Sequence, residues 1–117
     1  LGAEVISLGR TDQFVPIDTE AVAESDIRQA RLWATEYGFD AILSTDGDAD
    51  RPLLGDAQGN YLRGDVVGIL CARYLGAEAV ATPVSSNTAL EKCGAFKRVA
   101  RTRIGSPFVI EGMEQMI

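Results

Sequence analysis

The sequence of 117 residues contains no histidine and only two cysteines. Without histidine, the chain lacks the commonest transition-metal ligand and general base, so carboxylates are left as the obvious reactive groups. Cys71 and Cys93 lie far apart without CxxC spacing, which argues against a disulfide or a metal site. Because both fall within apolar helical patterns, we predict that they are buried free thiols.

Long apolar runs and an excess of basic residues are also missing. No stretch approaches the ~20 apolar residues that cross a bilayer, and residues 1–8 carry Glu4 without the basic lead-in of a signal peptide. We therefore expect a cytoplasmic protein with no membrane partner. The formal net charge of -6 argues against nucleic acid as a partner. With 46% hydrophobic and 24% charged residues, the composition is that of a globular protein with a real core.

Short apolar segments alternate with helical patterns along the chain, which predicts an α/β fold. Apolar and β-branched runs predict strands at 4–8, 41–44, 52–55, 60–62, 79–84 and 98–103. Helical spacing, with Gly38 and Gly76 as stop signals, predicts helices at about 25–37, 65–75 and 87–93, and a last one from Ser106 onward.

The most informative stretch is DGDADR at 46–51, directly after an apolar strand. Three carboxylates at alternate positions repel one another when they are crowded, and a divalent ion that prefers hard oxygen ligands relieves that repulsion. The intervening glycine and alanine are small, so the backbone can curl and direct the carboxylates inward. The pattern therefore predicts a divalent-cation site formed by Asp46, Asp48 and Asp50.

Two alternatives compete with this interpretation. An EF-hand calcium loop also begins Asp-x-Asp-x-Asp, but it needs glycine at its sixth position and glutamate at its twelfth, where this chain has Arg51 and Ala57. The EF-hand is therefore excluded. An acidic surface turn without an ion stays open, because such turns are common. Arg51 favours a site, since its guanidinium is suited to gripping a phosphate beside a magnesium ion.

The segment Ser44–Arg51 (STDGDADR) resembles the metal loop of the α-D-phosphohexomutases, the phosphomannomutase and phosphoglucomutase superfamily. Thr82–Asn87 (TPVSSN) resembles a strand-to-helix turn of that family's following domain, and Arg103–Met113 resembles its segment T-x-V-G-x-x-x-V-x-E-x-M. The likeness covers most of the chain from Gly38 onward. A non-catalytic cation-binding or interaction module is the alternative function, and such a module has no need of the segment from about Gly105 to Met113.

The resemblance implies an isomerase of carbohydrate metabolism that interconverts hexose 1-phosphate and 6-phosphate through a phosphoserine and a bisphosphate intermediate. The three aspartates would hold Mg²⁺ together with a phosphoserine oxygen, although Mn²⁺ fits similarly. Arg51 would contact the phosphoryl group, and Arg103 aligns with a basic family position at the substrate cleft. We interpret the neighbouring basic residues Lys97, Arg98 and Arg101 as solvated side chains of an exposed strand, and the same interpretation is the alternative for Arg103.

The resemblance further implies that residues 1–58 form the C-terminal part of the family's second domain and residues 59–117 the N-terminal part of its third. The family's Ser-His-Asn-Pro and Gly-Glu-x-Ser-Gly-His loops are absent from the chain, so we expect it to be inactive alone. We expect one compact α/β/α unit around a short mixed sheet, with exposed sheet edges that promote self-association. Two loosely joined lobes are the alternative.

Overall fold

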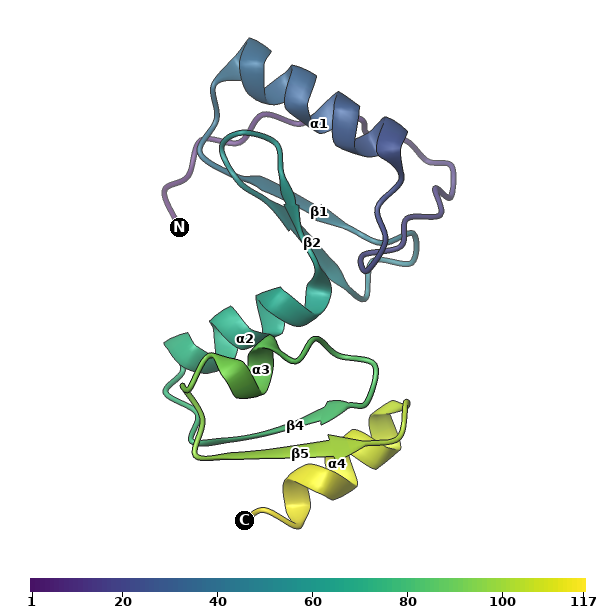
Figure 1. The fold of residues 1–117 in the computed structure, drawn as a ribbon. Coiled ribbons are helices and arrows are strands. Elements are labelled where there is room, and N and C mark those ends of the chain that lie inside the picture. The colour runs from purple at the N-terminus through teal and green to yellow at the C-terminus, as the bar shows by residue number, and fades with distance from the viewer.

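The computed structural model describes all residues from 1 to 117, which form two lobes along the longest axis of the molecule (Figure 1). The first lobe, residues 1–62, contains α1 (Glu24–Tyr37), β1 (Ile42–Thr45), β2 (Pro52–Gly55) and β3 (Tyr61–Leu62). The second lobe, residues 63–117, contains α2 (Gly64–Tyr74), β4 (Ala79–Pro83), α3 (Ala89–Lys92), β5 (Arg98–Thr102) and α4 (Ser106–Glu114). All predicted helices and all predicted strands but the first are therefore present.

In the first lobe, an antiparallel sheet of order β1-β2-β3 packs beside α1. The turn between β2 and β3 is held by the carboxylate of Asp56, which accepts the backbone N–H of Gln58 at 3.0 Å and that of Asn60 at 2.9 Å. Gly59 in this turn has a φ of 82°, and a Cβ there would lie only 2.7 Å from the carbonyl oxygen of Ala30. The hairpin turn and the buried side of α1 are therefore in direct backbone contact.

The predicted strand at 4–8 is wrong, because residues 1–23 form neither helix nor strand. Val5 and Ile6 are 79% and 45% exposed, and the segment pairs with no other strand. An extended segment becomes a strand only when a neighbour accepts and donates its backbone hydrogen bonds, and apolar composition alone does not supply that neighbour. With β1 and the end of α1, residues 2–6 and Leu8 line an open, largely apolar groove of about 670 Å³.

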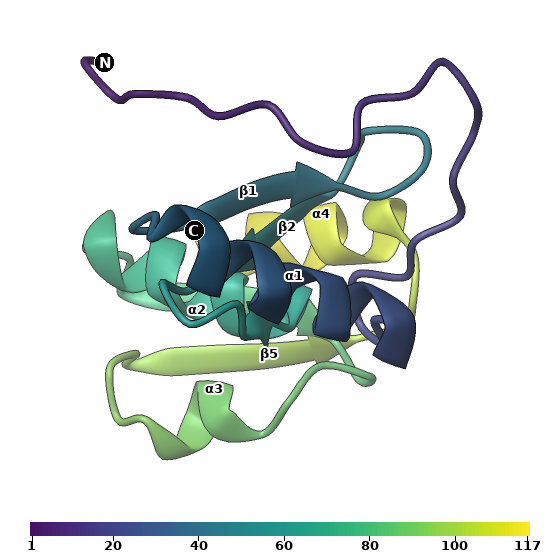
Figure 2. The ribbon, with the colours of Figure 1, turned by 90° about the horizontal axis from the view of Figure 1, so that it is seen from above.

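In the second lobe, β4 and β5 pair in parallel, with Ala79 opposite Arg98. α4 packs against both strands, while α3 lies on the opposite side of the strand pair in both views (Figures 1 and 2). The packing of α4 is close, since a Cβ on Gly112 would lie 2.8 Å from Cγ2 of Thr102. This arrangement is the α/β/α layering that the sequence predicts, so the fold class is confirmed.

The strands form two separate sheets, so the expected mixed sheet and the compact unit around it are wrong. The Cα radius of gyration is 16.2 Å, whereas a compact chain of this length has about 13 Å. Only 9 of the 117 residues are buried. The physical reason is α2, which lies between the two sheets and keeps β3 and β4 apart (Figure 1).

The lobes meet at the start of α2. The helix contacts β2, and both contribute buried apolar side chains, namely Leu53 of β2 and Val67 and Ile69 of α2. Two polar contacts reach the N-terminal segment: the backbone N–H of Gly64 donates to the carbonyl of Thr19 at 3.4 Å, and Arg63 forms an ion pair with Glu20 at 3.3 Å. The junction is therefore a packed contact rather than a bare linker.

Two further predictions concern the burial of the cysteines and the position of the domain boundary. Cys71 and Cys93 are free, as predicted, but both are exposed, because the small cores of the two lobes do not extend to them. The division between residues 58 and 59 stays a prediction about the family's domains; in the structure β3 pairs with β2, so the lobes divide after residue 62. No helix combines the length and the apolar character that a membrane span requires.

Candidate metal centre

The aspartate loop connects the antiparallel strands β1 and β2. It begins after Thr45, which faces Pro52 at the end of the ladder. The N–H of Asp46 donates to the carbonyl of Arg51 at 3.1 Å, and the N–H of Ala49 donates to the carbonyl of Asp46 at 3.2 Å. Ala49 has a φ of 61°, in the left-handed region that alanine seldom adopts. The six residues therefore form a tight turn closed by its own backbone.

Asp46 is the structural centre of this turn, and its side chain is only 9% exposed. One carboxylate oxygen, Oδ1, accepts the backbone N–H of Asp50 at 3.1 Å and that of Arg51 at 3.2 Å. Burial by itself raises the pKa of Asp46, but the hydrogen bonds from Arg51, Asp50 and Asp48 outweigh it, so the pKa lies below its ordinary value. Asp46 is therefore ionised at neutral pH.

The three aspartates converge. One carboxylate oxygen from each of Asp46, Asp48 and Asp50 lies within 4.8 Å of the others. The hydrogen bond to Asp46, burial, and the charges of Asp46 and Asp48 raise the pKa of Asp50. Oxygens at about 2.1 Å from one Mg²⁺ lie about 3–4 Å apart, so a small contraction of the loop suffices to place three ligands. The donor set and its unrelieved repulsion fit a hard divalent cation.

The structure gives the two small residues of the loop different roles, which the sequence did not separate. Ala49 supplies the left-handed turn. Gly47 has no positive φ, but a Cβ there would lie 2.5 Å from Cζ of Phe14 and 2.7 Å from the carbonyl oxygen of Val15. No local pattern in the sequence indicates this contact, because Phe14 and Val15 stand 33 and 32 positions before Gly47.

The two arginines predicted to contact phosphate lie in different lobes. Arg51 is 66% exposed, and its Nε lies 4.0 Å from Oδ2 of Asp46, so the guanidinium stands beside the aspartates and is free to reach outward. Arg103 follows β5 and stacks over Phe108, with 5.6 Å from Cζ to the ring centroid. No hydrogen bond or ion pair joins Arg103 to the aspartate loop. The turn between β5 and α4 nevertheless lies on the same side of the molecule as that loop (Figures 1 and 2).

Arg101 is not the solvated side chain that the sequence predicts. It is 24% exposed and forms two hydrogen bonds of 2.7 Å with Glu91, one to each carboxylate oxygen. It also donates to the carbonyls of Pro83, Ser86 and Asn87 at 2.7–3.2 Å. The pattern of polar and apolar residues along the strand could not reveal these bonds, since the partners belong to α3 and to the turn after β4. Arg101 therefore fastens that turn and α3 to β5, and a role in substrate contact is excluded by its full set of partners.

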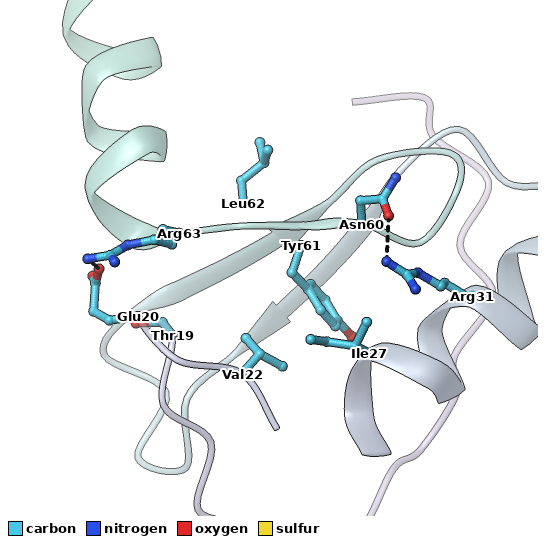
Figure 3. Close-up of a pocket in the computed structure, with 9 residues that line it drawn as sticks. All are labelled: Thr19, Glu20, Val22, Ile27, Arg31, Asn60, Tyr61, Leu62 and Arg63. Atoms are coloured by element: carbon cyan, nitrogen blue, oxygen red, sulfur yellow. Dashed lines mark hydrogen bonds and ion pairs between the residues drawn. The ribbon is translucent and has the colours of Figure 1, made fainter. Parts of the chain in front are cut away.

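A small pocket of about 230 Å³ lies between the N-terminal segment, α1 and the hairpin (Figure 3). The ring of Tyr61 lines it, with Arg31 donating to Asn60 at 3.3 Å on one side and the Arg63–Glu20 pair on the other. Burial and the nearby charge of Asp26 raise the pKa of Tyr61. None of the aspartates of the loop lines this pocket, so it is separate from the candidate metal centre.

The fold and the loop can now be compared with known proteins. Residues 63–116 match the family described as "Phosphoglucomutase/phosphomannomutase, alpha/beta/alpha domain III". Over 116 residues, 99% of this chain, the sequence is 56% identical to the phosphomannomutase of Salmonella muenchen and 47% identical to that of Sinorhizobium fredii. It is 33% identical over 122 aligned residues, covering 97% of this chain, to the phosphoglucosamine mutase of Erythrobacter litoralis.

The chain spans about a quarter of the length of these curated relatives, with 24% of both phosphomannomutases and 27% of the phosphoglucosamine mutase covered. The alignments with all three extend over both lobes, including the aspartate loop, whereas the family match begins at residue 63, where the second lobe begins. The second lobe also has the α/β/α layering that the family description names. The chain therefore belongs to the phosphohexomutase superfamily, with domain III of a phosphoglucomutase/phosphomannomutase in its second lobe.

Proposed function

We propose that this chain supplies the metal loop of a cytoplasmic phosphohexomutase that interconverts hexose 1-phosphate and hexose 6-phosphate through a phosphoserine and a bisphosphate intermediate. The observation that carries the proposal is the convergence of three carboxylates, one of them almost buried, in a loop closed by its own backbone. The relatives that align over both lobes are named as mutases of hexose phosphates, which supports the same reaction class. On its own, the chain is expected to be inactive.

Mg²⁺ would be held by Asp46, Asp48 and Asp50 with one phosphoserine oxygen as a further ligand, and it would neutralise charge on the phosphoryl group as that group is transferred. The protein's own contribution is to present oxygens that are already ionised and fixed. The hydrogen bonds from the backbone of residues 50 and 51 do both for Asp46. Asp48 and Asp50 are more exposed and complete the open side of the site.

The exposed guanidinium of Arg51 would contact the phosphoryl oxygens, since its position beside Asp46 leaves its donors outward. Arg103 would bind the phosphate of the hexose from the second lobe, on the same side of the molecule. In this proposal the two lobes approach one substrate from two directions. Kinetic measurements of the full-length enzyme on mannose, glucose and glucosamine phosphates would identify the hexose that it prefers.

The metal site is tested by titrating the chain with MgCl₂ while backbone amide shifts are followed. We expect residues 45–51 to shift with a midpoint in the millimolar range, because water fills the positions that the phosphoserine would take. Changing the three aspartates to asparagine should abolish those shifts. The matched control changes Asp12 and Asp40, which lie outside the loop and are exposed. Unchanged signals at residues 45–51 in the native chain contradict the metal site.

The reaction is tested in a chimaera in which this sequence replaces the aligned quarter of the Salmonella muenchen phosphomannomutase. We expect the chimaera to retain phosphomannomutase activity and Asp48→Asn to lower kcat by about a hundredfold or more, in the range seen when a group that stabilises transition-state charge is removed. Asp40→Asn serves as the control. A folded chimaera whose rate is unaffected by Asp48→Asn would leave the alternative of a non-catalytic cation-binding module.

A further inference from the structure

The loop of three aspartates is crossed by a distant segment of the chain. Residues 10–20 run alongside it in both views before they reach the start of α1 (Figures 1 and 2). We propose that residues 14–20 form a brace that positions the aspartate loop, with Phe14 as the positioning residue at the end that contacts the loop. This inference rests on the proposed function only in that Mg²⁺ is one of its two readouts.

The first observation is the contact at Gly47. A Cβ on Gly47 would lie 2.5 Å and 2.6 Å from Cζ and Cε2 of Phe14, and 2.7 Å from the carbonyl oxygen of Val15. The backbone of Gly47 is not in the left-handed region, so its conformation does not demand glycine. The missing side chain is needed because Phe14 and Val15 occupy the space. The loop and the segment are therefore complementary in shape at this point.

The second observation is the anchoring of the other end of the segment. Thr19 is 2% exposed, and its carbonyl accepts the N–H of Gly64 at the start of α2. Glu20 pairs with Arg63 at 3.3 Å (Figure 3), and Arg63 in turn donates to both carboxylate oxygens of Asp65 at 3.2–3.3 Å. The segment thus has one fixed end at α2 and a contact with the loop five residues earlier.

The side chain of Asp65 extends this anchor into the second lobe. It is 8% exposed and accepts the backbone N–H of Asn87 at 2.9 Å, in the turn after β4 that Arg101 also fastens. The brace therefore leads from the aspartate loop to a turn of the second lobe that is held by several hydrogen bonds. The aspartate loop is therefore supported by its contact with Phe14 and Val15 in addition to its own hydrogen bonds.

The exposure of Phe14 indicates what the contact is for. The ring is 70% exposed, so it gains little from removal of apolar surface, and a core role does not explain its place. A rigid aromatic edge against Gly47 instead limits how far the loop opens under the repulsion of its carboxylates. Phe14 acts through the loop and is not proposed to touch a ligand.

The test compares the native 117-residue chain with Phe14→Ala, Gly47→Ala and the double variant, and uses Tyr74→Ala, another exposed aromatic at 91%, as the matched control. We expect Phe14→Ala to weaken Mg²⁺ binding about tenfold, as the loss of a group that orients metal ligands does. Without Mg²⁺, it should also speed amide hydrogen exchange at residues 46–51. Gly47→Ala should weaken Mg²⁺ binding more than Phe14→Ala does. Adding Phe14→Ala to Gly47→Ala should restore part of the lost affinity. Tyr74→Ala should change neither readout.

Equal exchange rates at residues 46–51 in the native chain and in Phe14→Ala overturn the brace, whatever the metal does. If the native chain binds no Mg²⁺, the proposed metal site fails, and hydrogen exchange still decides the brace separately. Additive effects in the double variant also contradict the proposal, because they would show that Phe14 and Gly47 do not share one contact.

Discussion

The two lobes each present one candidate phosphate-contacting arginine, but they position it by different means. In the first lobe, Arg51 belongs to a loop between antiparallel strands, and backbone hydrogen bonds within six residues fix its geometry. In the second lobe, Arg103 follows a parallel strand and is held by stacking on Phe108 after the chain turns at Gly105, whose φ is 132°. The first arrangement is local, and the second depends on α4 being packed against β4 and β5.

The layers around the strands differ as well, although each lobe has three buried apolar residues. Ala30, Ala34 and Leu53 are buried in the first lobe, whose β1 has an open edge, and Val67, Ile69 and Leu90 are buried in the second. In the second lobe the strand pair has helices on both sides. A metal loop that is closed by its own hydrogen bonds can thus persist beside an open sheet edge, whereas a side chain placed by packing needs the helices that cover the strand pair of the second lobe.

The largest expected effect comes from the core of the first lobe. Leu53 is 1% exposed, and Leu53→Ala should lower the free energy of unfolding by about 2–5 kcal/mol, from lost burial and the cavity left behind. Leu43 on the neighbouring strand is 81% exposed, so Leu43→Ala should stay within about 0.5 kcal/mol. Hydrogen exchange checks both variants, and faster exchange in both lobes of Leu53→Ala would show that the contact between β2 and α2 makes the two lobes unfold together.

A second expected effect, somewhat smaller, concerns the turn that packs on α1. Gly59→Ala forces a side chain into a position with φ of 82° and 2.7 Å from the backbone of Ala30 and Arg31, so it should cost about 3 kcal/mol. Gly68 in α2 has nothing within 4 Å of its Cβ position, and Gly68→Ala should stabilise the chain by up to about 1 kcal/mol. Chemical denaturation of both variants measures the difference. A neutral Gly59→Ala would contradict the close contact.

The sequence predicted the elements of both lobes where the signal was local. Gly38 ends α1 with a φ of 63°, and the apolar runs before and after the aspartate loop are strands, because glycine stops and side-chain periodicity are properties of neighbouring residues. The strand at 4–8 and the single sheet failed because pairing partners are set by distant parts of the chain. Nothing within residues 4–8 determines whether a neighbouring edge is available.

The same distinction holds within the candidate site. The convergence of the three aspartates followed from their spacing, and it is found in the structure. The contact between Phe14 and Gly47 joins residues 33 positions apart, and the bonds from Arg101 to the turn after β4 span 14–18 positions. A single sequence read by itself carries no signal for such distant contacts, so they could be found only from the structure.

A third, smaller effect tests how the second lobe is fastened. The hydrogen bonds from Arg101 hold the pKa of Glu91 below its ordinary value of 4.5, so the pair stabilises the folded state above that pH, and the contribution is lost as pH falls through the lower folded pKa. The Tm of the native chain should therefore exceed that of Glu91→Gln near pH 7. The two values should converge between about pH 5 and about pH 3, as protonation removes the pair. A constant difference down to pH 3 would show that charge is not the cause.

The smallest effect is expected at an ion pair of the same length in the same lobe. Lys97 and Glu78 are also 2.7 Å apart, but their side chains are 73% and 71% exposed, and neither fastens a turn. Glu78→Gln should therefore change the free energy of unfolding by less than about 1 kcal/mol, and added salt should weaken even that contribution. Urea denaturation at low and high salt measures it beside Glu91→Gln. If both variants were equally destabilised, the length of an ion pair would decide what it contributes in this lobe. Burial of Arg101 and its additional bonds to carbonyls would then add nothing to stability.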